Sequence, residues 1–486
     1  MGENQATLAG LFRQFLPAES ILVSTEERRP YECDGLSVYR QLPLLVVLPE
    51  TVEQVQQILR ICYEHQVPVV ARGAGTSLSG GALPLENGVL LSLAKFNHIL
   101  DIDPNNRTAR VQPGVRNLAI SEAVAEHGLY YAPDPSSQIA CTIGGNVAEN
   151  AGGVHCLKYG LTVHNIRKLV MVTIEGELLE IGSEALDSPG YDLLALMTGS
   201  EGMLGVIVEV TVRLLPVPER AQVILAAFDD VIKAGAAVGN IISAGIIPAG
   251  LEMMDRLAIR AAEDFVHAGY PLDAEAILLC ELDGNNEEVS EQILQVRHLL
   301  LQSGATEVRT ASTEAERQTL WKGRKAAFPA VGRLAPDYYC MDGTIPRHRL
   351  PEVLNTISEL SGEYDLPVAN VFHAGDGNLH PLILYDANKP GELKRTEEFG
   401  GRILELCIEV GGTITGEHGV GVEKINQMCV QFAAAELAQM HAIKAAFDSE
   451  GLLNPGKAVP TLHRCAEFGA MHVHQGELPF PELERF

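Results

Sequence analysis

A glycine-rich loop at residues 72–81 constrains this chain more than any other stretch. It reads Arg-Gly-Ala-Gly-Thr-Ser-Leu-Ser-Gly-Gly and follows the apolar run at 67–71, which we predict to be a strand. Glycine reaches positive φ and lets a ligand approach the backbone closely, so neighbouring N–H groups can form a nest for an anion. The spacing fits neither G-x-G-x-x-G nor a Walker loop. We predict a phosphate cradle of another type, with an ordinary glycine-rich turn as the alternative.

Two further loops share this character. Residues 142–153 read Thr-Ile-Gly-Gly-Asn-Val-Ala-Glu-Asn-Ala-Gly-Gly and come after a Pro-Asp-Pro-Ser-Ser stretch at 133–137. Residues 198–205 read Thr-Gly-Ser-Glu-Gly-Met-Leu-Gly and enter a predicted strand. Ordering such loops costs conformational entropy that ligand contacts can offset, so three of them favour a large bound cofactor over three plain turns.

Size, charge and cysteines narrow the classes of protein. A chain of 486 residues is too long for one typical core, and a net charge of −27 argues against a nucleic-acid partner. None of the nine cysteines forms a C-x-x-C pair, which excludes the standard iron–sulfur and zinc-ribbon signatures. The sequence shows neither a signal peptide nor an apolar run long enough to span a membrane. We expect a cytoplasmic protein that can attach peripherally to a membrane.

The order of predicted elements suggests several segments. A strand at 44–49, a helix at 52–65 and a strand at 67–71 form a strand–helix–strand unit, and Pro216 and Pro218 mark a boundary. We expect a helical lead-in at 1–40, a first domain at 41–218, a second domain at 219–425, a C-terminal helical segment at 426–460 and a tail at 461–486.

The densest chemical cluster lies in the second domain. His373 and His380 flank an Ala-Gly-Asp-Gly-Asn-Leu stretch, and Glu417 and His418 follow later in Gly-Glu-His-Gly. If the glycine turn folds the chain back, the two imidazoles converge. Glu417 would complete a His-His-Glu set of the kind that binds zinc, manganese or iron. A lone histidine is more often a hydrogen-bonded structural residue, but this constellation has no evident packing purpose.

Together the three loops resemble the FAD-binding domain of the vanillyl-alcohol oxidase and p-cresol methylhydroxylase (PCMH) superfamily. Over nearly its whole length the chain is similar to the D-2-hydroxyacid dehydrogenase group, which includes the D subunits of bacterial glycolate oxidases. The resemblance implies an α+β fold, in which a PCMH-type FAD-binding domain precedes an FAD-linked-oxidase cap domain with a mixed sheet and helices. The first loop lacks the histidine of covalent flavoproteins, so we expect non-covalent FAD; Cys141 and Cys156 are the alternative attachment points.

In such proteins the first loop holds the FAD pyrophosphate, and the other two line the adenine and isoalloxazine rings. A C-terminal Leu-Leu-Asn-Pro-Gly-Lys segment often returns to the flavin domain, although Asn-Pro-Gly ends a helix on any account. The cofactor-binding residues implied by the resemblance are Arg72, Gly73, Ala74, Gly75, Thr76, Ser77, Leu78, Ser79, Gly80, Gly81, Pro135, Ser136, Ile143, Gly144, Gly145, Asn146, Asn150, Gly152, Gly153, Glu201, Gly202, Gly205, Val206 and Asn454.

The resemblance also assigns roles in the second domain. It implies that His373, His380 and Glu417 bind a divalent metal and that His418 is the general base. Arg324 matches the arginine of a tryptophan-x-x-arginine segment and would clamp the substrate carboxylate; without the family, a solvated basic face is the alternative. Members of the resembled group also place a lysine near a Tyr-x-x-Asp stretch. The stretch Tyr-Cys-Met-Asp at 339–342 offers none, which by this resemblance disfavours a large dicarboxylate substrate.

The function implied is an FAD-dependent 2-hydroxyacid dehydrogenase. Glycolate would be oxidised to glyoxylate by hydride transfer to FAD, with D-lactate as a second substrate. Electrons would pass to an iron–sulfur subunit and a second flavin-type subunit, which would hold the chain at the inner membrane. A stand-alone D-lactate dehydrogenase and a non-catalytic flavin-binding assembly subunit are the alternatives. The tail at 461–486 is expected to be disordered or to dock on a partner subunit.

Overall fold

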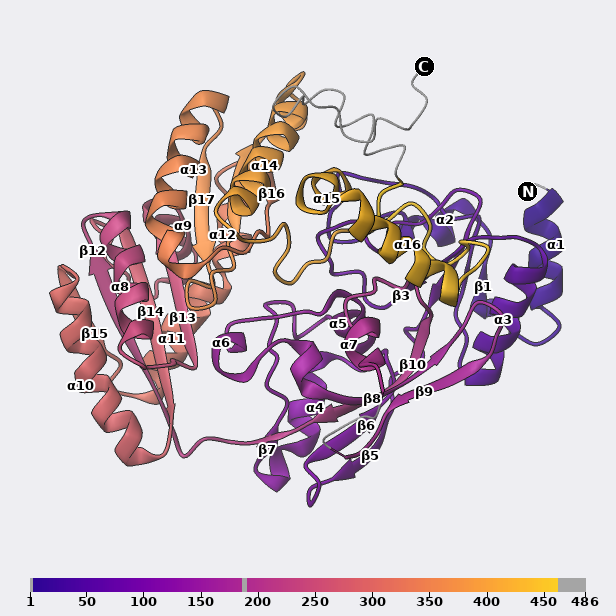
Figure 1. The fold of residues 1–486 in the computed structure, drawn as a ribbon, viewed down its shortest axis with the longest axis horizontal. Coiled ribbons are helices and arrows are strands. Elements are labelled where there is room, and N and C mark those ends of the chain that lie inside the picture. The colour runs from indigo at the N-terminus through magenta and orange to yellow at the C-terminus, as the bar shows by residue number, and fades with distance from the viewer. Residues whose placement is uncertain (1–2, 186–189, 462–486) are drawn as a thin grey trace. The chain divides into compact units, whose positions relative to one another are not determined.

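The computed structural model describes residues 3–185 and 190–461, and the chain divides into two compact units (Figure 1). The first unit comprises Met1–Gly152, Leu161–Pro216 and Glu417–Phe486, and the second comprises Gly153–Gly160 and Val217–Gly416. Apart from residue 461, the segment for which we expected disorder or docking on a partner lies outside the described residues.

A small sheet in the first unit carries the glycine-rich loop at 72–81. Its strand order is β1-β2-β4-β3, in which β2, β4 and β3 run parallel and β1 is antiparallel to β2. The bounds are β1 Ile21–Leu22, β2 Leu45–Val47, β3 Val69–Arg72 and β4 Val89–Ser92. Because β3 ends at Arg72, the loop begins where the parallel strand stops, the edge at which such sheets bind ligands.

Helix α3 (Val52–Glu64) makes the crossover between β2 and β3. Thr51 and Gln54 form a capping box at its start, and Val55, Ile58, Leu59 and Cys62 are buried. Each aliphatic side chain buried in this way stabilises the fold by about 1.5–3 kcal/mol. The predicted strand–helix–strand unit is confirmed.

A second sheet in this unit is antiparallel throughout, with the order β5-β6-β10-β8-β9. A short pair, β7 with β11, lies outside it. The bounds are β5 Ile99–Asp103, β6 Thr108–Val111, β7 Leu129–Tyr130, β8 Ile166–Val172, β9 Leu178–Gly182, β10 Val206–Arg213 and β11 Leu215–Pro216.

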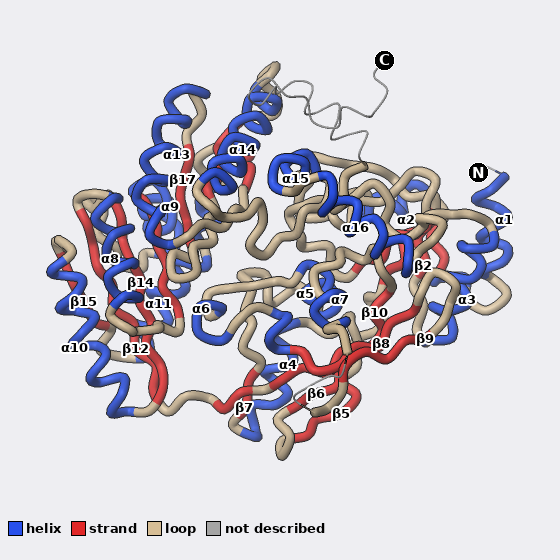
Figure 2. Tube along the Cα trace, viewed as in Figure 1, coloured by secondary structure: helices blue, strands red, loops and turns tan. Residues whose placement is uncertain are grey.

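The helices of the first unit include two from the far C-terminal part of the chain (Figure 2). After α16 the chain adds to the small sheet: Val69 N donates to Leu452 O and Asn454 N donates to Val69 O, both at 2.8 Å. The remaining bounds are α1 Glu3–Phe12, α2 Thr25–Arg28, α4 Asn117–Val124, α5 Ile143–Glu149, α7 Leu193–Met197, α15 Ile425–Gln431 and α16 Ala434–Phe447, with 3-10 helices at Ala18–Ser20, Arg29–Tyr31, Ala125–His127 and Thr162–Asn165.

The second unit is built on one seven-stranded sheet with the order β15-β12-β14-β13-β17-β18-β16. The bounds are β12 Arg220–Phe228, β13 Gly250–Asp255, β14 Ala276–Gly284, β15 Glu307–Thr310, β16 Asp337–Cys340, β17 Val368–Phe372 and β18 Pro381–Tyr385.

Every pairing between these described strands is antiparallel. The expectation of a mixed sheet is therefore corrected in this respect. The reason is topological: the crossover through α8 carries the chain from β12 to β13, and β14 then inserts between these two parallel strands.

Helices alternate with the strands along this unit (Figure 2). Helix α8 packs against α10 and α13, and α9 packs against α11 and α12. The bounds are α6 Cys156–Tyr159, α8 Val231–Ser243, α9 Arg256–Val266, α10 Asn286–Gln302, α11 Glu314–Lys325, α12 Ala327–Val331, α13 Leu350–Tyr364 and α14 Glu392–Glu409, with a 3-10 helix at Arg347–Arg349. Among the helices described, none has the length and apolar character needed to cross a bilayer.

Candidate functional site

The loop at 72–81 is shaped by two glycines with positive φ, Gly75 at 70° and Gly80 at 76°. A Cβ on Gly75 would lie 2.3 Å from Arg72 Nη2, so the guanidinium folds beneath the loop. Arg72 Nη1 donates to Cys33 O at 2.6 Å, and the guanidinium stacks over the Tyr31 ring. Through these contacts with Cys33 and Tyr31, the Arg72 side chain stabilises the conformation of the loop.

The first and second loops meet at Gly73 and Thr142. A Cβ on Gly73 would lie 2.2 Å from Thr142 Oγ1, so any larger residue at position 73 would require Thr142 to move. Thr142 Oγ1 is buried and has no hydrogen-bond partner within 3–185 and 190–461. A buried hydroxyl without a partner costs about 1–3 kcal/mol. A cofactor that supplied a partner would remove this cost, and in this respect the residues present fit FAD.

Other residues of the second loop serve the protein's own packing. A Cβ on Gly144 would lie 2.5 Å from Pro113 Cβ. Asn146 Oδ1 accepts from Asn117 Nδ2 at 3.0 Å, and Asn150 Oδ1 accepts from Val163 N at 3.0 Å. Their side chains therefore set the loop's shape. Of the stretch before this loop, Pro135 is buried and Ser136 is exposed.

In the third loop, Glu201 and Gly202 both adopt positive φ, at 49° and 70°. The Glu201 carboxylate turns to the C-terminal part of the chain: Oε1 accepts from Val420 N and Oε2 accepts from Gly421 N, each at 2.7 Å. A Cβ on Gly205 would collide with the Met171 side chain. These are contacts within the protein, and the cofactor contacts expected for Glu201 and Gly205 stay a prediction.

The C-terminal signature segment fastens the first loop. Asn454 Nδ2 donates to Gly81 O at 2.9 Å and to Glu201 O at 2.6 Å. Lys457 Nζ donates to Gly81 O at 3.1 Å, to Asn454 Oδ1 at 2.6 Å and to Leu83 O. Burial lowers the pKa of Lys457 to about 7, against the opposing pull of nearby carboxylates. Sequence reasoning missed Lys457, although its place in Asn-Pro-Gly-Lys was visible.

In the second unit, a hairpin brings His373 and His380 together. His373 follows β17 and His380 precedes β18, and these strands pair. His373 N donates to Asn378 O at 3.0 Å, and Gly377 turns the chain with φ 83°. The imidazole centroids lie 5.0 Å apart with their planes nearly perpendicular. The expected convergence of the two imidazoles is observed.

Each histidine ring is oriented through Nδ1. His373 Nδ1 lies 2.9 Å from Glu252 Oε1, and His380 Nδ1 lies 3.4 Å from Met341 O. Because both partners are acceptors, the neutral rings carry the proton on Nδ1 and the lone pair on Nε2. This arrangement is the usual support of a metal-binding histidine. The donor set therefore fits a divalent metal.

Glu252, on β13, links the hairpin to Arg324. Arg324 Nη2 lies 2.6 Å from Glu252 Oε2, and both side chains are 1% exposed. Burial acts to raise the pKa of Glu252, but its electrostatic interactions with His373 and Arg324 outweigh burial and leave the pKa below its usual value. Sequence reasoning missed Glu252; its signal was a lone carboxylate in the apolar run Leu-Glu-Met-Met.

Arg324 is not a solvated surface residue. Its contact with Glu252 lacks hydrogen-bond geometry, and neither Nε nor Nη2 has a hydrogen-bond acceptor among the described residues. A fully buried guanidinium with unused N–H groups suits an anionic ligand.

The second unit ends beside the hairpin. Gly416 N donates to Asp342 O at 2.9 Å, and a Cβ on Gly416 would lie 2.4 Å from Asn378 Oδ1. Glu417 is the next residue in the chain and His418 follows it. In the first unit, His418 O accepts from Ser77 Oγ at 3.2 Å. Ser77, expected to bind cofactor, thus also holds the backbone of the expected base.

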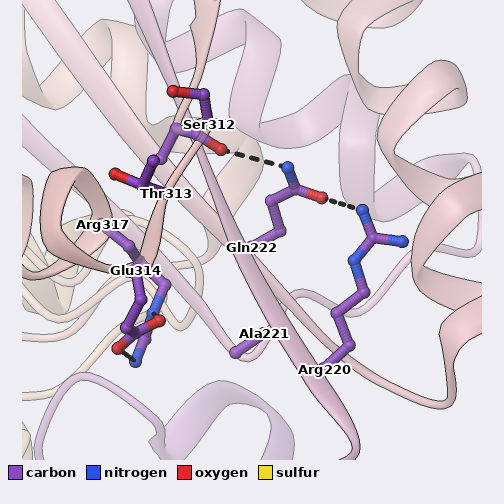
Figure 3. Close-up of a pocket in the computed structure, with 8 residues that line it drawn as sticks. Arg220, Ala221, Gln222, Ser312, Thr313, Glu314 and Arg317 are labelled. Atoms are coloured by element: carbon purple, nitrogen blue, oxygen red, sulfur yellow. Dashed lines mark hydrogen bonds and ion pairs between the residues drawn. The ribbon is translucent and has the colours of Figure 1, made fainter.

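A separate cavity of about 210 Å³ lies in the second unit between β12 and the start of α11 (Figure 3). It contains none of the residues predicted from the sequence. Its polar groups bond to one another: Gln222 Nε2 donates to Ala311 O at 3.1 Å and Gln222 Oε1 accepts from Arg220 Nη2 at 2.5 Å. We assign it no role.

Comparison with known proteins identifies the class. The FAD binding domain model matches residues 43–182, and the model for FAD linked oxidases, C-terminal domain, matches residues 217–458. Among solved structures, p-cresol methylhydroxylase superposes with a TM-score of 0.80 at 18% identity, covering 95% of this chain and 98% of that one, which shows a shared fold. The chain is an FAD-dependent oxidoreductase of the PCMH-type flavoprotein class.

Sequence identity to named proteins identifies the family within this class. Glycolate oxidase subunit GlcD of Escherichia coli strain K12 is 71% identical over 474 residues, covering 98% of this chain and 95% of that protein. The Bacillus subtilis subunit of the same name is 41% identical, covering 89% and 93%. The D-lactate dehydrogenase of Anaerostipes hadrus is 33% identical, covering 92% and 96%. The chain belongs to the FAD-linked oxidase family that contains the glycolate oxidase subunit GlcD.

Proposed function

We propose that this chain is the flavin-bearing catalytic subunit of a glycolate oxidase, which oxidises glycolate to glyoxylate. The observation that carries the proposal is the 71% identity to a protein of that name over nearly the whole of both chains. The intact histidine hairpin and the buried Arg324 support a catalytic role over that of a flavin-binding assembly subunit.

Oxidation of a 2-hydroxy acid removes a hydride from Cα and a proton from the hydroxyl. When bound, FAD supplies the hydride acceptor, and a divalent metal supplies Lewis-acid polarisation of the hydroxyl. His373, His380 and Glu417 would hold the metal, which is zinc, manganese or iron by the donor set. The FAD is held without a covalent bond.

The chain's own residues perform the remaining tasks. Arg324 holds the substrate carboxylate with its unused N–H groups. His418 takes the hydroxyl proton as general base. Glu252 keeps the His373 proton on Nδ1, so that the Nε2 lone pair would be available to hold a metal. The loops at 72–81, 142–153 and 198–205, with Asn454, form the flavin cradle.

Electrons from reduced flavin pass to partner subunits, an iron–sulfur subunit and a second flavin-type subunit. Support comes from the name of the relatives, which is that of a subunit. Through these partners the chain would be placed at the inner membrane.

Steady-state turnover with a dye acceptor tests the substrate. We expect a higher kcat/KM for glycolate than for D-lactate, and negligible turnover of large dicarboxylates. A kcat/KM for D-lactate well above that for glycolate would instead support a D-lactate dehydrogenase. That function is the second candidate because a relative of that name is 33% identical to this chain.

A further inference from the structure

Several hydrogen bonds within the first unit hold the backbone at and after the expected base. His418 O accepts from Ser77 Oγ at 3.2 Å, and Gly419 O accepts from Lys424 Nζ at 2.9 Å. Val420 N and Gly421 N both donate to Glu201, at 2.7 Å each. The last two contacts thus depend on one residue, Glu201, which is 5% exposed.

A second carboxylate lies against the same backbone. A Cβ on Gly419 would lie 2.0 Å from Glu149 Oε2 and 3.0 Å from Glu201 Oε1, and Gly419 has φ 78°. A Cβ on Gly81 would lie 2.8 Å from Glu149 Oε1 and 3.5 Å from Glu201 Oε2. The two carboxyl groups therefore converge in the space between the first flavin loop and the loop of the base.

Burial raises the pKa of both carboxyl groups. Burial, followed by the negative charges of Glu201 and Asp34, raises the pKa of Glu149 well above its usual value, against the opposing pull of Lys424 and Lys457. Burial also raises the pKa of Glu201, but its two backbone N–H donors favour the ionised form. Two adjacent carboxyl groups cannot easily both ionise, so the arrangement favours a proton shared by the pair.

We propose that Glu201 is a positioning residue for the reaction: its carboxylate, beside the carboxyl group of Glu149, fixes the His418–Gly421 backbone against the first flavin loop. The inference rests on the proposed function, because it assumes that His418 is the base. It gives Glu201 a task different from cofactor contact, for which its motif was first noted.

Glu201→Gln in the FAD-loaded chain tests the proposal. The amide keeps one acceptor but presents an NH₂ group to the second backbone donor. We expect faster deuterium exchange of the amides at 419–422 and a kcat for glycolate that is lower by about 10- to 100-fold, because small misplacements of catalytic groups are costly. The KM should stay within about threefold, as expected when ground-state binding is retained.

The matched control is Glu209→Gln on β10, where the carboxylate pairs with Arg110 on the surface. Both variants should bind FAD and unfold at similar temperatures. Unchanged exchange at 419–422 in Glu201→Gln, or an unchanged kcat, overturns the proposal. Failure of the wild type to oxidise glycolate would instead overturn the proposed function, while the exchange result would still report on the Glu201 contacts.

Glu149→Gln provides a second test that remains available if Glu201→Gln does not fold. The folded-state pKa of Glu149 lies above its unfolded value of 4.5, so the folded chain binds the extra proton. This contribution to stability is present below pH 4.5 and is lost as the pH rises through the folded pKa. In the FAD-free chain, Glu149→Gln should remove this loss of stability with rising pH. In the FAD-loaded chain it should remove the matching fall in kcat with rising pH. Persistence of both in the variant overturns the shared-proton arrangement.

Discussion

At the residue scale, the chemistry of the second unit depends on a chain of buried polar contacts. Arg324 faces Glu252, which faces His373, and all three are buried. The sequence predicted His373, His380 and Arg324 from their motifs. It did not predict Glu252, because a single acidic residue in an apolar strand has no spacing rule that links it to a histidine far along the chain.

Glu252→Gln tests this link. The amide can accept one hydrogen bond from His373 Nδ1 but loses the negative charge that favours the Nδ1-protonated ring. We expect metal affinity to fall about 10- to 100-fold, the usual effect of changing such a supporting group. Metal retained after dialysis against graded chelator measures it. Glu275→Gln, which alters an exposed ion pair with Arg256, is the control; equal metal affinities in the two variants would contradict the assignment.

Arg324→Lys tests the carboxylate clamp. Lysine keeps the charge but cannot bind a carboxylate with two parallel N–H donors. We expect KM for glycolate to rise by at least about tenfold, since hydrogen bonds to charged groups contribute about 1.5–3 kcal/mol. Initial-rate kinetics provide the measurement, with the exposed Arg349→Lys as control. A KM unchanged from wild type would remove Arg324 from substrate binding.

At the scale of elements, the sequence predicts the glycine turn between the two histidines. It does not predict the tertiary contact that holds this turn in place. Gly-Asp-Gly-Asn signals a turn in any sequence. That a Cβ on Gly377 would lie 2.2 Å from Ile345 O depends on a contact between distant segments. Likewise, helix α3 could be predicted from its period and cap, whereas the pairing of Val69 with residues 452–454 could not.

Gly377→Ala should therefore be severe. The new Cβ meets a backbone oxygen, and φ of 83° is strained for alanine. Gly391→Ala is the matched control, because Gly391 has φ 80° but nothing within 4 Å of the new Cβ. We expect the control to lose about 1 kcal/mol of unfolding free energy, the Gly377 variant to lose about 1–3 kcal/mol more, and the Gly377 variant alone to lose metal. Denaturant unfolding and metal analysis measure these effects. Equal losses of unfolding free energy and of metal in the two variants would contradict the importance of the close contact.

Lys457 fixes the first flavin loop to the C-terminal segment. The pH dependence of its contribution to the free energy of unfolding can be predicted. The folded pKa of about 7 lies below the unfolded value of 10.5, so the unfolded chain binds the extra proton between these values. The contribution of this group to unfolding free energy therefore rises with pH by up to about 1.4 kcal/mol per unit in that window. Lys457→Met should lack this rise relative to wild type. Parallel curves of stability against pH for the two proteins would contradict it.

At the scale of the whole molecule, the class and cofactor were predictable because three loops together are far more specific than one. The antiparallel sheet of the second unit was not, because strand order depends on which strand inserts between two others rather than on local patterns. The chain's fold and family establish an FAD-dependent oxidoreductase. The substrate is our proposal.

Anaerobic mixing of the FAD-loaded chain with glycolate tests that account most directly. Glycolate should bleach the visible flavin absorbance of the wild type in a single turnover. His418→Asn should retain FAD but bleach at least about 100-fold more slowly, because a general base contributes about 10²- to 10⁴-fold. Absence of bleaching in the wild type would contradict the proposed function, and equal bleaching rates in the two proteins would contradict the assignment of His418 as the base.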